Sequence, residues 1–177
     1  MTAVLQFPTK QTEYLSTPEL AKHLRQILKA RFPRCRFSVR SNSYAGGSSI
    51  DISWTDGPTA GLVDSLVKGL EGSSFDGMID LKSSRRVDLN GKRILTDFIF
   101  TRRELSAEFL KRVRDAVGTH YNAPRESWPA VVPARYGAYL EACSDSTSPI
   151  IGGADSRWHT WRGLVHRAAE NRAEVCD

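Results

Sequence analysis

The clearest structural signal in this sequence is CRFSVRSNSYAGGSSIDISW, residues 35–54. Apolar and polar residues alternate at both ends of this stretch, and a Gly/Ser-rich loop joins the two alternating runs. Alternation with a period of two is typical of strands that bury one face. We therefore predict an antiparallel hairpin, whose polar face would bring Arg36 and Arg40 near Asp51.

Helical periodicity lies on both sides of this hairpin. Before it, apolar residues recur three and four positions apart from Thr17 to Phe32, where the following proline ends the helix. After it, Asp56 and Pro58 have the residue types of a helix start, and the apolar stripe runs on to Leu70. We expect one helix in each place.

A second hairpin is indicated by Asn90-Gly91, because both positions of the tightest hairpin turn need positive φ. It would join residues 85–89 to residues 92–101. Ser106 then caps a third helix that ends at Gly118. Residues 71–80 are expected to form an irregular crossover whose apolar residues fill the core edge, namely Phe75, Met78 and Ile79.

The resulting order is α-β-β-α-β-β-α, which predicts an α+β fold. It would be a mostly antiparallel sheet of two hairpins with helices packed on one face, plus a C-terminal helical extension. We expect residues 1–13 to be a flexible leader and residues 14–118 to be the α+β domain. Residues 119–177 are expected to be a loop-rich extension, with a helical piece over 135–143 and an amphipathic helix over 156–174.

Charge is segregated along the chain, which has 25 Lys and Arg against 20 Asp and Glu. Residues 20–50 contain bases but no acid, residues 51–81 are acidic, and residues 82–125 are basic again. Such segregation indicates either a face for nucleic acid or an acidic partner, or two surfaces that pair within the fold.

A cytoplasmic protein is expected, because no apolar run reaches the ~18 residues of a membrane span and the start lacks the pattern of a secretion signal. The three cysteines lie far apart without C-x-x-C spacing, which favours free thiols in a reducing compartment; they are Cys35, Cys143 and Cys176.

The strongest candidate for a functional surface is the basic segment. Helix and strand spacing would place its side chains on one surface, with an aromatic residue at the hairpin tip that could stack on a ligand. The alternative is a solvated or internally paired set of charges. The candidates are Lys22, Arg25, Lys29, Arg34, Arg36, Arg40 and Tyr44.

Weaker candidates are carboxylates that could hold Mg²⁺ for phosphodiester chemistry, namely Asp51, Asp56, Asp76 and Asp80. Local roles in a helix cap, a turn and an ion pair explain the same residues. No nuclease, P-loop, zinc or nucleophile motif completes them, so no catalytic residue, metal or cofactor is assigned and no enzyme is expected.

Two tryptophans in the C-terminal segment, Trp158 and Trp161, share a helical face. Tryptophan is favoured at interface centres, so this pair could anchor a homodimer or another protein. The alternative is packing against the protein's own core.

Three motifs together resemble a known family: RFPRCRFSVRSNSYAGGSSIDISWTDGP (31–58), FDGMID (75–80) and DFIFTRRELS (97–106). The resemblance, over about residues 14–106, is to a large polyvalent protein-associated domain, the twenty-ninth of that series. It implies a setting in phages and conjugative elements, whose very large proteins join such domains to helicase, methylase, protease-like or antirestriction modules. Most of these domains have no established activity.

These observations favour a mobile-element accessory protein that acts by binding nucleic acid or a host defence nucleoprotein in the bacterial cytoplasm. Anti-defence action, of the anti-CRISPR or antirestriction type, is the most concrete version of this expectation. The alternatives are a metal-dependent enzyme acting on nucleic acid and a protein–protein adaptor. A homodimer is possible, and no membrane partner is expected.

Overall fold

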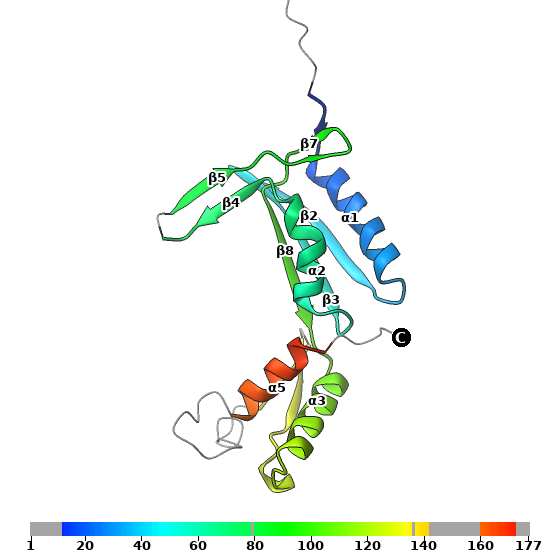
Figure 1. The fold of residues 1–177 in the computed structure, drawn as a ribbon, viewed down its shortest axis with the longest axis vertical. Helices are drawn as coiled ribbons and strands as arrows, with labels where there is room; N and C mark the ends of the chain where they lie inside the picture. Colours follow the sequence, from blue (N-terminus) through cyan, green and yellow to red (C-terminus); the bar gives the residue numbers. More distant parts are fainter. Residues whose placement is uncertain (1–11, 79, 136, 142–159, 173–177) are drawn as a thin grey trace, which may run out of the picture.

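The fold is described by a computed structural model of residues 12–78, 80–135, 137–141 and 160–172 (Figure 1). Helices and strands of both pairing types are present, which confirms the α+β class. The elements are β1 (Tyr14–Leu15), α1 (Thr17–Arg31), β2 (Phe37–Tyr44), β3 (Gly47–Thr55), α2 (Ala60–Val67), η1 (Lys68–Leu70), β4 (Ser73–Asp76), β5 (Leu81–Ser84), β6 (Asp88–Leu89), β7 (Lys92–Ile94), β8 (Phe98–Glu104), α3 (Ala107–His120), η2 (Arg125–Ser127), β9 (Val131–Ala134), β10 (Gly137–Leu140) and α5 (Trp161–Glu170).

A three-stranded sheet in the order β2-β3-β8 organises the first part of the chain. β2 and β3 form the expected antiparallel hairpin, and Arg40 lies directly opposite Asp51. β8 is parallel to β3, with Ile99 opposite Ile50, so the expected antiparallel pairing of this segment is wrong. The chain crosses over through α2 between these two strands, and a crossover connection returns a strand parallel to its neighbour.

The second hairpin exists but is short. Its turn has the expected positive φ, 52° at Asn90 and 81° at Gly91, and it joins β6 to β7 only. β7 ends at Ile94, and the next strand, β8, begins at Phe98 and belongs to the β2-β3-β8 sheet. The prediction of one long strand over residues 92–101 is therefore wrong. The second half of this segment forms β8, which pairs with β3 and buries Ile99.

Helices α1 and α2 pack on one face of the three-stranded sheet, as expected. Leucines of α1 and valines of α2 meet the inward residues of all three strands. We name this cluster the first core; it comprises Leu20, Ala21, Leu24, Leu28, Val39, Ile50, Ile52, Trp54, Val63, Val67, Ile94 and Ile99.

A projecting hairpin of β4 and β5, which we name the arm, extends from one end of the sheet (Figure 1). Phe75 is 57% exposed and Met78 is 92% exposed. The expected irregular crossover that fills the core edge with these side chains is therefore wrong. The segment pairs with itself as two antiparallel strands and so extends away from the core. Ile79 lies outside the described residues.

A second core lies beyond β8, where α3 and α5 pack together with the β9–β10 hairpin (Figure 1). The expected helical piece over 135–143 is wrong in its described part, because β10 pairs antiparallel with β9 there. Helix α3 belongs to this core, so the expected boundary at residue 118 divides it. The buried members are Phe109, Leu110, Val113, Val117, Leu140, Trp161, Leu164, Val165 and Ala169.

The two cores are joined by the side chain of Arg103. Its guanidinium donates to the carbonyl oxygens of Asp56 at 2.8 Å and Gly57 at 3.1 Å. It also donates to those of Ala169 at 2.7 Å and Arg172 at 3.0 Å, beside the C-terminal end of α5. One side chain thus ties the turn after β3 to the last turn of the C-terminal helix.

Cys35 is disulfide-bonded, which corrects the expectation of a free thiol at this position; Cys143 and Cys176 lie outside the described residues. The helices in the described part of the chain are all too short or too polar to cross a bilayer.

Candidate nucleic-acid interface

The predicted basic residues are divided between α1, the loop that leads into β2, and β2 itself. Lys22 and Lys29 are exposed on α1, and Arg34 and Arg36 are exposed in the loop that leads into β2. None of these four cations has an ion-pair partner among the described residues. We name these four unneutralised cations the basic edge.

Arg25 has a different role from its neighbours on α1. Its guanidinium donates to the backbone oxygen of Val39 in β2. Because β2 is an edge strand, this contact satisfies an outward-facing carbonyl and fixes α1 against the sheet. The structure thus gives Arg25 a structural partner that sequence spacing does not reveal.

Arg40 and Tyr44 lie on the sheet face opposite the helices. Val39 points into the first core, so the alternate residues of β2 point the other way, and Ser38, Arg40, Asn42 and Tyr44 are all exposed. We name this side of the three-stranded sheet the open face. Its members on β3 are Ser49, Asp51 and Ser53, and those on β8 are Phe98, Phe100 and Arg102.

Two aromatic residues of the open face were not predicted as site residues. Phe98 and Phe100 stack at 6.1 Å between ring centroids, and Phe100 is 52% exposed. The predicted single strand over residues 92–101 would place them on the same face as Ile94, which is buried. The signal that identifies them is the alternation within β8 itself, where Ile99 takes the core position and its neighbours must face outward.

Two lysines flank this aromatic pair. The ammonium group of Lys68 lies 5.8 Å from the Phe100 ring centroid, and that of Lys82 lies 5.7 Å from the Phe98 centroid. Both are within reach of a cation–π attraction. Lys68 is paired with Glu71 at 2.8 Å and Lys82 with Asp97 at 2.9 Å, so their charges are partly neutralised.

Asp97 organises the junction of the arm, the β2–β3 turn and β8. Its carboxylate accepts from the Ser73 hydroxyl at 2.7 Å and the Ser48 backbone N–H at 2.9 Å. Burial acts to raise the pKa of Asp97, but the hydrogen bonds from Lys82, Ser73 and Ser48 outweigh it and hold the pKa below its usual value. The ionised carboxylate is therefore the form that fixes this corner.

The four candidate metal ligands do not come together. Asp51 accepts a hydrogen bond from Asn42 on the open face, and Asp56 accepts one from the Ser106 N–H at 2.8 Å near the start of α3. Asp76 and Asp80 lie in the arm. Among the described residues no three His, Cys, Asp or Glu side chains form a group that could hold a metal ion.

The expected tryptophan anchor is only partly within the described residues. Trp161 is 1% exposed and contacts Trp128 inside the second core, so at this position the expectation of an interface anchor is wrong and the alternative of packing against the protein's own core holds. Trp158 lies outside the described residues.

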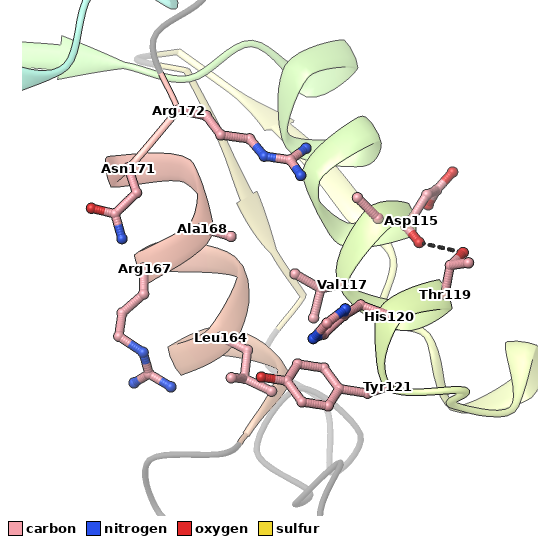
Figure 2. Close-up of a pocket in the computed structure, with 11 residues that line it drawn as sticks. Asp115, Val117, Thr119, His120, Tyr121, Leu164, Arg167, Ala168, Asn171 and Arg172 are labelled. Carbon is pink, nitrogen blue, oxygen red and sulfur yellow. Dashed lines mark hydrogen bonds between the residues drawn. The ribbon is translucent and has the colours of Figure 1, made fainter.

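A groove of about 790 Å³ lies between α3 and α5 (Figure 2). Val117 and Leu164 form its apolar floor. Polar residues line it as well, and Figure 2 shows His120 extending from α3 toward α5. The groove is thus separate from the open face and belongs to the other core.

Comparison with known proteins identifies the first part of the chain. The family model described as Large polyvalent protein associated domain 29 matches residues 15–106, which include the first core, the basic edge and the open face. No curated protein and no solved structure matches the chain.

Proposed function

The chain belongs to the family of large polyvalent protein associated domain 29, and from that premise we propose that it is a mobile-element accessory protein that binds nucleic acid. The family fits a protein associated with phages and other mobile elements. The observation that supports binding is the basic edge, where exposed cations have no acidic partner in the described part of the chain. It would act in the cytoplasm of a bacterial host.

Unpaired cations favour phosphate because each contact releases condensed counterions from the nucleic acid. Lys22, Lys29, Arg34 and Arg36 lie within a sequence segment that contains no acid, and the whole chain carries a net charge of +5. Binding through these residues would be weakly dependent on sequence and strongly dependent on salt.

A salt titration of binding to a fluorescent duplex and a matching single strand tests this proposal. The double variant Arg34→Glu/Arg36→Glu should weaken binding and reduce the salt slope by about 1 to 2, one for each lost phosphate contact. Lys111→Glu/Arg162→Glu is the matched control, because it makes the same change in net charge at two exposed cations on α3 and α5, away from the basic edge. Equal weakening by both variants would show a net-charge effect and contradict a specific basic edge.

Anti-defence action, of the anti-CRISPR or antirestriction type, is the finer version of the proposal, and it is supported by the mobile-element family. Its test is phage plating efficiency on a bacterial host that carries a restriction or CRISPR system. The wild-type chain should raise plating, and Arg34→Glu/Arg36→Glu should abolish the increase. Unchanged plating with the wild-type chain would reject this role while leaving nucleic-acid binding in place.

A further inference from the structure

We infer, resting on the proposed function, that the open face binds the unpaired bases of single-stranded nucleic acid. The observation behind this inference is separate from the basic edge: it is the aromatic and polar composition of the sheet face opposite the helices. Basic residues attract any phosphate backbone, whereas exposed aromatic rings distinguish free bases from paired ones.

Aromatic rings stand at both sides of the open face. Tyr44 on β2 and Phe100 on β8 are each 52% exposed, and Phe98 stacks beside Phe100. With β3 between them, the two strands lie about 10 Å apart. Bases of a single strand can be splayed across such a surface and stack on successive rings, but the bases of a duplex are already stacked on one another.

The residues between the rings supply hydrogen-bonding groups. Arg40, Asp51 and Phe100 form one row across the three strands, and Asn42, Ser49 and Phe98 form the next. Ser49 is buried, so in this row the exposed Asn42 amide, which also donates to Asp51, is the group that can meet the edge of a stacked base.

Cations border the aromatic surface on both sides. Arg36 and Arg40 lie toward β2, and Lys68 and Lys82 lie within 5.8 Å of the phenylalanine rings on the β8 side. A strand that crosses the sheet would thus meet Arg36 and Arg40 at the β2 edge, and at the β8 edge two lysines whose charges are partly neutralised by Glu71 and Asp97. This combination of a charged border and a stacking surface is typical of single-strand binding.

The composition of the open face favours nucleic acid over a protein partner. The centre of a protein interface is depleted of charged residues and of serine. The outward residues of β2, β3 and β8 within the register-paired part of the sheet are Ser, Arg, Asn, Tyr, Gly, Asp, Thr, Phe and Glu, without Leu, Ile or Val. The exposed aliphatic residues of this region lie elsewhere, as in Met78 and Leu81 of the arm.

Fluorescence anisotropy with three strands of about 12 nucleotides tests the inference. Oligothymidine and oligouridine are intact strands that carry bases, and the third is an abasic strand that keeps only the sugar-phosphate backbone. We expect either intact strand to bind more tightly than the abasic strand and than a duplex. Phe100→Leu should weaken binding of the intact strand about 5- to 150-fold, the loss of one stacked base, without changing binding of the abasic strand. Phe100→Tyr, which keeps an aromatic ring, should bind like the wild type.

The outcomes separate this inference from the proposed function. Equal affinity for intact and abasic strands, unchanged by Phe100→Leu, would overturn base stacking while leaving phosphate binding by the basic edge intact. Absence of binding to all strands and to the duplex would overturn both. Because Phe100 is half exposed, Phe100→Leu should retain the wild-type urea midpoint, which confirms that a loss of binding is not a loss of fold.

Discussion

At the scale of single residues, Asp97 shows how one carboxylate fixes the corner of the candidate interface. It holds Ser48 at the β2–β3 turn, Ser73 at the base of the arm, and Lys82 beside the Phe98 ring. Loss of this charge would remove the side-chain contact at the base of the arm and release the lysine that borders the aromatic pair, while the backbone hydrogen bonds of Gly72 and Ser73 would remain. The residue lies in the DFIFTRRELS motif of the family resemblance, so part of that motif serves to position the open face.

We expect Asp97→Asn to destabilise the protein by about 1–3 kcal/mol at neutral pH, because charge-assisted hydrogen bonds are lost. The folded pKa of Asp97 lies below its unfolded value, so its contribution is complete above the unfolded pKa of about 3.9 and disappears as pH falls through the folded pKa. Urea unfolding of wild type and variant from pH 7 downward should show the two stabilities converging in acid.

Asp88→Asn is the control for this prediction. Asp88 pairs with Arg86 at 3.2 Å on the surface, with 43% of its side chain exposed, and such pairs contribute less than about 1 kcal/mol. A constant difference between wild type and Asp97→Asn down to strongly acid pH would contradict the charge-based explanation.

At the scale of secondary structure, the sequence predicts correctly those features that depend only on one helix, one strand pair or one turn. The span of α1, the pairing of Arg40 with Asp51 and the Asn90-Gly91 turn are short-range features, and each is as predicted or within one residue; Arg36, also expected near Asp51, lies beyond the Phe37–Trp54 pair. In α1 the cap is Ser16, whose backbone N–H donates to Glu19 at 2.9 Å.

Long-range pairing was not predictable in the same way. The alternation of apolar and polar residues in β8 is the same whether its neighbour is parallel or antiparallel. Its parallel pairing with β3 follows from the burial of Ile99 opposite Ile50. The free edge of β8 is closed by Glu71, which accepts from the Ile99 N–H at 2.7 Å, and by Lys68, which donates to the Ile99 oxygen. Such partners are distant in sequence, so the open face and its aromatic pair required the structure.

Helix α3 was predicted to end at Gly118, but it continues to His120 because this glycine serves packing. A Cβ atom at Gly118 would lie 2.4 Å from the Trp128 ring, and the Trp128 indole N–H is held by the Ala123 oxygen at 3.1 Å. Gly118→Ala gains about 1 kcal/mol of helix propensity and loses about 1–3 kcal/mol to overpacking. We expect net destabilisation in urea unfolding followed by tryptophan fluorescence.

Gly61→Ala in α2 is the matched substitution, because a Cβ atom there meets nothing within 4 Å. The same change should therefore stabilise the protein by up to about 1 kcal/mol. Stabilisation by both substitutions would show that Trp128 moves aside at little cost, and it would contradict the packing role of Gly118.

At the scale of the whole molecule, the family motifs explain how two cores are joined. Asp56 and Gly57 belong to one motif and Arg103 to another, and they meet at the junction, where Arg103 also binds the end of α5. The Arg103 guanidinium lies 5.0 Å from the Phe109 ring of the second core. The matched region thus contains both the candidate interface and the attachment point for the rest of the chain.

Arg103→Ala should therefore uncouple the two cores. Its carbonyl partners would lose charge-assisted hydrogen bonds, each worth about 1.5–3 kcal/mol, with part of the loss recovered by water at this half-buried site. We expect amide hydrogen exchange of α3 and α5 to accelerate more than that of β3, because the first core keeps its own sheet and helices. Arg86→Ala, which removes an exposed side chain paired with Asp88 at 3.2 Å, should leave both rates nearly unchanged. If amide exchange accelerated equally in both cores, the two cores would unfold as one cooperative unit, and this would contradict the expected uncoupling.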